Sequence, residues 1–205
     1  MSFKTEQEEF WSGQFGEDYI SRNQSEQLVI RRVVHFGRFL RSAPDVKSII
    51  ELGCNVGMNL TALKRLNPAF ELKAYEINAK AAQIARELGV ADVVTGTAVD
   101  PIDTDRTYDL SFTSGVLIHI NPAALNAVYE NLYRLSNRYI LINEYYNPTP
   151  LTVEYRGAKD RLFKRDFAGE LMDRYSLRLV DYGFLYHRDN YFPRDDSNWF
   201  LLEKA

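Results

Sequence analysis

Hydrophobic residues in the middle of the chain follow two alternating patterns. Segments that predict strands occupy residues 46–52, 70–77, 92–98, 108–114 and 139–145, and the first of them is typical of a buried strand. Patterns with helical spacing lie between them, at residues 58–66, 79–88 and 121–135. Asn78 and Gly89 are suited to start and stop the second of these helices. Strands that alternate with helices in this way predict a mostly parallel sheet covered on both faces.

The two ends of the chain extend this pattern. Residues 1–24 are polar with scattered aromatic side chains and predict a short helix and loop packed on a larger body. Apolar residues recur at helical spacing over 24–40, before a break at Ser42-Ala-Pro-Asp. Further predictions are a helix at 166–175 and two closing strands, at 177–185 and 199–202. The sheet predicted from these segments has seven strands.

Composition narrows the class of protein. The 205 residues are 45% hydrophobic and 26% charged, which suits one ordinary globular domain. No apolar run reaches the roughly 20 residues that span a bilayer, and the polar N-terminus predicts no secretory signal. A single cysteine, Cys54, excludes an internal disulfide and a cysteine-rich metal site, and a reducing cytoplasm is the expected location. A net charge of −3 gives no overall attraction to nucleic acid or to acidic membranes, and three scattered histidines predict no metal centre.

The segment Glu51-Leu-Gly-Cys-Asn-Val-Gly57 follows the first predicted strand and favours a ligand-binding turn. Gly53 permits a tight turn, Gly57 permits close approach of the backbone, and Asn55 tolerates a left-handed conformation. The dinucleotide fingerprint would need glycines at positions 53, 55 and 58, and a P-loop would need Gly-Lys-Ser/Thr. Neither is present, which disfavours a phosphate cradle. Glu51 instead favours a cationic amine.

A second acid, Glu76, closes the next predicted strand. Carboxylates at this position in such sheets accept hydrogen bonds from ribose hydroxyls. An acidic loop followed by a ribose-binding acid describes a nucleoside with a positively charged amino-acid tail. S-adenosylmethionine is such a molecule.

With these features, residues 46–145 resemble the class I S-adenosylmethionine-dependent methyltransferases. ELGCNVG is similar to their acid-x-Gly-x-Gly-x-Gly loop, with Asn55 in place of the middle glycine, and YEIN is similar to their ribose-binding strand end. TGTA at 95–98 falls where the family contacts the adenine edge, and YDLSFTSGVLIHI at 108–120 resembles the fourth strand and its loop. The resemblance implies a Rossmann-like fold with a mostly parallel seven-stranded sheet, helices on both faces and an antiparallel last strand.

A narrower resemblance covers nearly the whole chain. FWSGQFGEDYISRN, NEYYNPTP, RLFKRDFAGE and the DYGFLYHRD…WFLLEK ending are similar to the methylases associated with pseudaminic acid biosynthesis. It implies a small-molecule acceptor of the nonulosonic acid class, free or nucleotide-activated. The implied organisation is one domain over 1–205, with a helical cap at 1–45, a cofactor-binding core at 46–145 and an acceptor side at 146–205.

Each cofactor-binding prediction has a stated role. Glu51 is expected to bind the methionine amine, the backbone of Gly53, Asn55 and Gly57 to lie against the methionine and ribose, and Glu76 to bind the ribose. The resemblance further implies the following contacts: Ile77 on the adenine face, Thr97 and Ala98 at its edge, Ser114 and Val116 beside the methionine, and Trp11, Tyr19 and Arg22 in an N-terminal cap. Arg22 would pair with the methionine carboxylate, and Tyr19 would lie near the sulfonium. The alternative is that Trp11 and Tyr19 only anchor the N-terminal segment to the core.

The acceptor predictions follow from the need for an in-line nucleophile about 3 Å from the methyl carbon. His119, after the fourth strand, is the leading candidate base for a hydroxyl acceptor, with Glu144 the second; a hydrogen-bonded histidine that only holds the loop is the alternative. His35 is expected to be structural. RGAKDRLFKR, at 156–165, places five positive charges around one acid, and such a run is either a solvated face or a site for an anion. The predicted acceptor-binding residues are Tyr145, Tyr146, Arg156, Arg161, Lys164, Arg165 and His187.

Two other functions compete with this interpretation. A methyltransferase for RNA is disfavoured by the acidic charge balance and the short basic run, whereas a protein substrate stays open. A methyltransferase-like binding protein without catalysis also stays open, because the acids at 51 and 76 predict cofactor binding and not turnover.

Overall fold

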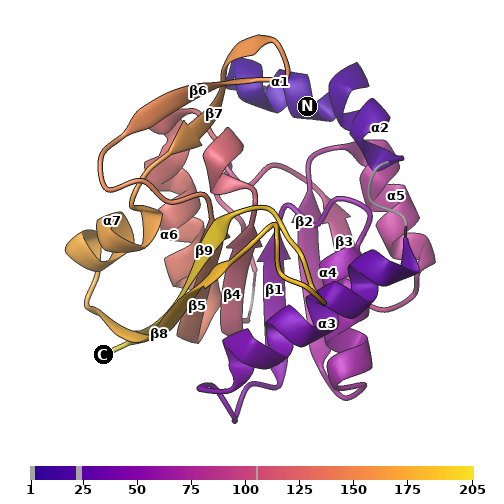
Figure 1. Cartoon of the computed structure of the whole chain (residues 1–205), viewed down its shortest axis with the longest axis vertical. Coiled ribbons are helices and arrows are strands. Elements are labelled where there is room, and N and C mark those ends of the chain that lie inside the picture. The colour runs from indigo at the N-terminus through magenta and orange to yellow at the C-terminus, as the bar shows by residue number, and fades with distance from the viewer. Residues whose placement is uncertain (1–2, 22–24, 105) are drawn as a thin grey trace.

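The computed structural model describes residues 3–21, 25–104 and 106–205 and has one central sheet (Figure 1). Its seven strands have the order β3-β2-β1-β4-β5-β9-β8. The strands of this sheet are β1 (Ser48–Leu52), β2 (Glu71–Glu76), β3 (Asp92–Thr95), β4 (Tyr108–Ser114), β5 (Ser136–Glu144), β8 (Leu177–Leu185) and β9 (Ser197–Lys204). The first five are parallel, while β9 is antiparallel to both β5 and β8. The predicted seven-stranded, mostly parallel sheet with an antiparallel last strand is therefore confirmed.

Helices pack on both faces of this sheet, and two short helices precede them in the N-terminal region. They are α1 (Glu6–Ser12), α2 (Gln14–Ile20), α3 (Glu26–Leu40), α4 (Met58–Leu66), α5 (Ala79–Glu87), α6 (Leu125–Leu135) and α7 (Phe167–Arg174), with short 3-10 turns η1 (Leu117–His119) and η2 (Pro122–Ala124). No described helix is long and apolar enough to cross a membrane.

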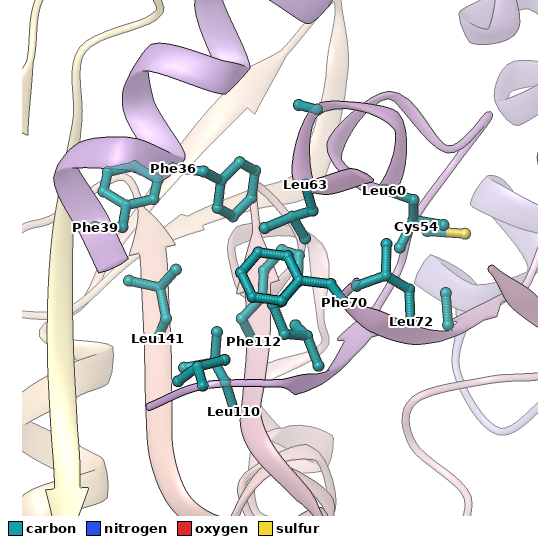
Figure 2. Packing of buried hydrophobic residues seen from close by; sticks show 14 of the residues in the cluster. Phe36, Phe39, Cys54, Leu60, Leu63, Phe70, Leu72, Leu110, Phe112 and Leu141 are labelled. Atoms are coloured by element: carbon teal, nitrogen blue, oxygen red, sulfur yellow. The ribbon is translucent and has the colours of Figure 1, made fainter. Parts of the chain in front are cut away.

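Alternation of side chains along each strand divides the core between the two faces of the sheet. In β1, Ile49 packs with α3, α4 and α5, whereas its neighbour Ile50 packs with α6 and α7. Figure 2 shows the first cluster, where Phe36 of α3 meets Phe112 of β4 with ring centroids 5.4 Å apart. Because both faces are covered, β1 is buried along its whole length, as the sequence predicted.

A two-stranded hairpin, β6 (Leu151–Tyr155) and β7 (Ala158–Lys164), lies outside this sheet and was not predicted. Its turn has positive φ angles at Arg156 (51°) and Gly157 (80°). The hairpin lies beside α1 (Figure 1), where the Gln7 side chain donates to the Asp160 carbonyl at 2.9 Å. The basic run at 156–165 thus forms a hairpin strand and its turn.

Candidate active site

A cavity of about 730 Å³ lies at the carboxyl ends of the parallel strands. Its walls come from the loops after β1, β2, β4 and β5, from α1 and α2, from α3, and from the loop between β8 and β9. Open parallel sheets bind ligands at this edge, where the strand order reverses. Here the reversal falls between β1 and β4.

The glycine loop forms one wall of the cavity through a strained backbone. Gly53 has a φ of 81° and Asn55 a φ of 48°, and both residues line the cavity. A Cβ at Gly53 would lie 2.5 Å from a Val116 methyl carbon, so only glycine fits the turn. Gly57 differs from the prediction, because it does not line the cavity. It starts α4 with a φ of 79° and allows close packing against Ala85 of α5.

Glu76 ends β2 and lines the cavity. Its two carboxylate oxygens accept backbone N–H groups, from Asn55 at 2.7 Å and from Asn78 at 2.8 Å. Burial raises the pKa of Glu76, and these hydrogen bonds oppose the rise. A carboxylate has about four acceptor sites, so acceptor capacity remains for a ligand hydroxyl.

Glu51 is fully buried beneath the cavity and does not line it, which differs from the expected direct contact with an amine. The Asn59 side chain donates to Glu51 Oε1 at 2.6 Å, and Oε2 has no hydrogen-bond partner. Burial raises the pKa of Glu51 to about 8. Asn59 also accepts from Arg32 Nε at 3.0 Å, so its amide connects the acid to a guanidinium in the cavity wall.

The predicted adenine-edge residues, Ile77, Thr97 and Ala98, all line the cavity. The Thr97 hydroxyl donates to Glu8 Oε1 of α1 at 2.6 Å and accepts from the Val99 amide at 3.1 Å. Thr97 is therefore tied to the N-terminal helices, a contact that the sequence did not reveal.

The N-terminal helices α1 and α2, called the cap below, cover one side of the cavity. Trp11 and Tyr19 both line it, with their ring centroids 5.4 Å apart. The Asn78 side chain donates to the Trp11 carbonyl at 3.2 Å, which holds the cap against the start of α5. Arg22 lies outside the described residues.

His119 lines the cavity between two aromatic rings. Its ring centroid lies 4.5 Å from that of Trp11 and 5.0 Å from that of Tyr155. Its Nδ1 is 2.6 Å from the Arg161 carbonyl oxygen, which only accepts, so Nδ1 carries the hydrogen and Nε2 keeps a lone pair. Burial lowers the pKa of His119 to about 4, so the ring is neutral near pH 7.

Glu144 ends β5 and shapes the loop after β4. Its oxygens accept the amides of Val116 at 3.0 Å and Ile118 at 3.4 Å, and burial raises its pKa to about 7. Ser114 and Val116 line the cavity as predicted. The carboxylate thus supports the loop, in addition to lining the cavity itself.

The basic run contributes less to the cavity than its charge suggested. Arg156 lines the cavity, whereas Arg161, Lys164 and Arg165 do not. Arg161 pairs with Glu6 at 3.2 Å and Arg165 with Glu170 at 2.7 Å.

The other side chains near this run also differ in whether they line the cavity. Lys164 lies over the Tyr145 ring at 5.4 Å. Tyr145 lines the cavity and donates its hydroxyl to Asp195 at 3.1 Å. Tyr146 is exposed and does not line the cavity. Its backbone forms an isolated β-bridge with Arg165.

The loop at 186–196, between β8 and β9, supplies groups that sequence reasoning missed. His187 lines the cavity as predicted, and its Nδ1 lies 2.8 and 2.9 Å from the two Asp196 carboxylate oxygens. Arg194 and Asp195 also line the cavity, as do Arg32, Asn59 and the mainly buried His35 of the other wall. No local motif marks these residues, because long-range packing brings them to the site.

No protein-family model matches the sequence, and neither does any curated protein. Solved structures do match it over most of the chain. Magnesium protoporphyrin IX methyltransferase from Synechocystis, with bound SAH, is 13% identical, has a TM-score of 0.70 and covers 97% of this chain and 98% of its own. CalS10, an amino pentose methyltransferase from Micromonospora echinaspora, is 11% identical, with a TM-score of 0.67 and coverages of 93% and 96%. The N-methyltransferase NodS from Bradyrhizobium japonicum is 12% identical, with a TM-score of 0.66 and coverages of 88% and 98%. This chain therefore has the fold of the S-adenosylmethionine-dependent methyltransferases.

Proposed function

We propose that this protein transfers a methyl group from S-adenosylmethionine to a small anionic acceptor. The observation that carries the proposal is the carboxylate of Glu76, held at the cavity wall by the amides of Asn55 and Asn78 with acceptor capacity to spare. Ribose hydroxyls are donors that suit it. The methyltransferases that share the fold support the same assignment.

The residues around the cavity fit such a cofactor. Glu51 Oε2 is a buried acceptor without a partner, and Asn59 and Arg32 connect it to the cavity wall. An ammonium group bound at this wall would favour the ionised carboxylate through its charge. When bound, the cofactor supplies an electrophilic methyl group on a positively charged sulfur. The protein's own part is to position the acceptor and to accept a proton from it where one is released.

Three groups are proposed as the base for a hydroxyl acceptor. His119 and Glu144 are the candidates from sequence, and His119 has the neutral tautomer that a base requires. His187 is added by its geometry, because donation from Nδ1–H to Asp196 leaves the Nε2 lone pair available at the cavity.

The acceptor is proposed to be a nonulosonic acid of the pseudaminic type, or its nucleotide-activated form. The narrower sequence resemblance supports this choice, as do the arginines in the cavity wall, among them Arg156 and Arg194. The neighbours described above carry different acceptors in their names, so they give this finer assignment no support.

Two measurements test the proposal in order. Isothermal titration calorimetry with S-adenosylmethionine and S-adenosylhomocysteine should show binding of both, and Glu76→Ala should abolish it. Mass spectrometry should then detect transfer of a labelled methyl group to free or nucleotide-activated nonulosonic acids. Absence of binding in the first measurement would refute the cofactor, whereas binding without transfer to any of these sugars would refute the acceptor class alone.

A further inference from the structure

Two arginines in the cavity wall make no direct ion pair with a carboxylate, although the charges of Glu51 and Asp195 act on both from a distance. Arg32 comes from α3 and Arg194 from the β8–β9 loop, and both line the cavity. Across the described residues, neither forms an ion pair. The hydrogen-bond acceptors of both are neutral: Arg32 donates to Asn59 Oδ1 at 3.0 Å and the Leu28 carbonyl at 3.2 Å, and Arg194 to Ser114 Oγ at 2.9 Å.

Such an arrangement is costly without an anion. Burial lowers the pKa of Arg32 to about 10, with a further contribution from the positive charge of Arg194, and burial also lowers the pKa of Arg194. Buried charges in proteins are normally paired, because desolvation outweighs what neutral partners return. An anion that enters the cavity would reduce the repulsion between the two arginines and give them the direct partner that Glu51 and Asp195 do not provide.

The two guanidinium groups are held by different elements of the cavity wall. Arg32 is tied through Asn59 to Glu51 and so belongs to the wall beside the glycine loop. Arg194 is tied to Ser114 at the end of β4, on the side of β4 and β5. Ser114 Oγ also accepts from the Asn143 side chain at 2.8 Å, so its own O–H is a further donor next to the guanidinium.

The loop that carries Arg194 is fixed from both sides. On one side, Arg31 donates to the Pro193 carbonyl at 3.4 Å and His35 Nε2 lies 3.2 Å from the Phe192 carbonyl oxygen. On the other side, Tyr145 donates to Asp195. Figure 1 shows this loop running from the β8 and β9 end of the sheet across to α3. The guanidinium is therefore positioned before any ligand binds, which lowers the entropy cost of binding.

We infer that Arg194 is the receptor for a carboxylate group on the methyl acceptor, with the Ser114 hydroxyl as a second donor to it. The planar guanidinium fork matches a carboxylate, and Tyr145, a predicted acceptor-binding residue, lies close to Arg194 through its hydrogen bond to the adjacent Asp195. The inference rests on the proposed methyltransferase function and adds to it the side chain that selects an acidic acceptor. The carboxylate of the cofactor's own methionine is the other group with the same chemistry, so the test separates the two.

The test compares two probes that differ in one charge, N-acetylneuraminic acid and its methyl ester. Their binding to the full-length protein, saturated with S-adenosylhomocysteine, is measured by calorimetry, as is the affinity for S-adenosylhomocysteine itself. The variants are Arg194→Gln, Arg194→Lys and Arg32→Gln, with Arg178→Gln on the outer strand β8 as the matched surface control.

The inference expects the parent protein to bind the acid at least tenfold more tightly than the ester. Arg194→Gln should reduce this ratio to near one while changing the affinity for S-adenosylhomocysteine less than twofold, and Arg194→Lys should keep part of the ratio. A parent protein without preference for the acid overturns the inference. So does an Arg194→Gln variant that keeps the ratio, including one that instead loses tenfold in affinity for S-adenosylhomocysteine, since Arg194 would then hold the cofactor. Failure of the parent to bind S-adenosylhomocysteine at all would refute the proposed function instead.

Discussion

Thr97 Oγ1 donates a hydrogen bond to Glu8 Oε1 at 2.6 Å, across 89 positions of sequence. Glu8 is buried in α1, and its other oxygen accepts the backbone amides of Lys4 and Thr5, so it holds the start of its own helix as well. Through this one carboxylate, the loop after β3 is connected to the helices that cover the cavity.

Replacement of Thr97 by valine should therefore loosen the cap without altering the shape of the loop. A hydrogen bond to a charged group contributes about 1.5–3 kcal/mol, and other contacts of the cap remain, so a loss of roughly tenfold in affinity for S-adenosylhomocysteine is expected. Calorimetry measures it, and Thr152→Val on the exposed strand β6 is the control. Unchanged affinity in Thr97→Val would mean that the cap does not contribute to cofactor binding.

Replacement of glycine by alanine should have opposite effects on stability at positions 53 and 37. Gly53→Ala combines a φ of 81° with a Cβ that would lie 2.5 Å from a Val116 methyl carbon, so it should destabilise the fold by about 1–3 kcal/mol. Gly37 lies in α3 with nothing within 4 Å of an added Cβ, so Gly37→Ala should stabilise by about 0.5–1 kcal/mol. Urea denaturation of both variants checks the two signs. A Gly53→Ala protein as stable as its parent would show that the loop relaxes more easily than its contacts indicate.

Glu51 predicts a dependence of stability on pH with a defined sign. The pKa of Glu51 is about 8 in the folded protein, whereas the ordinary pKa of a glutamate is 4.5. Between these values the folded state holds a proton that the unfolded chain has released, so Glu51 lowers the free energy of unfolding as the pH rises from about 5 to 8. Glu51→Gln keeps an acceptor for Asn59 and cannot ionise, so its stability relative to the parent should grow by at most about 1.4 kcal/mol per pH unit.

Denaturation of the ligand-free proteins at pH 5, 6.5 and 8 measures this difference. His35 and His119, whose pKa values burial lowers to about 4, contribute equally to parent and variant and cancel. Glu154→Gln on the exposed strand β6 serves as the control and should show no such trend. A difference that stays flat with pH would mean that Glu51 is ionised throughout, with Arg32 as its effective counter-ion.

The parts of the fold that the sequence predicted are those with a local cause. Tyr108–Ser114 was predicted with its observed bounds because its apolar residues Tyr108, Leu110 and Phe112 alternate with polar ones, which is the period of a strand. The hairpin of β6 and β7 was missed because most of its side chains are exposed or half-buried, which removes the alternation that marks a strand. Contacts with the cap, such as the hydrogen bond from Gln7 to the Asp160 carbonyl, instead stabilise the hairpin.

The residues of the site also differ in whether the sequence predicted them. Gly53, Asn55 and Glu76 were found because backbone conformation and strand position specify them within a short motif. Arg32 and Arg194 carry no such mark, since each is one of many polar residues until packing brings α3 and the β8–β9 loop together. The cavity residues at strand ends were therefore predictable from sequence, whereas those brought in by α3 and the β8–β9 loop depend on tertiary contacts.

The basic run at 156–165 tests whether acceptor-binding residues can be predicted from sequence, because its charge alone predicted an acceptor site. Arg161 pairs with Glu6 and lies 5.3 Å from the Phe10 ring centre, so it connects β7 to the cap. Arg161→Ala should then weaken the binding of S-adenosylhomocysteine by roughly two- to fivefold, since a partly exposed pair contributes less than about 1 kcal/mol. Arg165→Ala removes a pair with Glu170 of α7 and should change only the thermal stability. Steady-state kinetics with an identified acceptor decides the matter, because a rise in acceptor KM in both variants, with cofactor affinity unchanged, would return the run to the acceptor site.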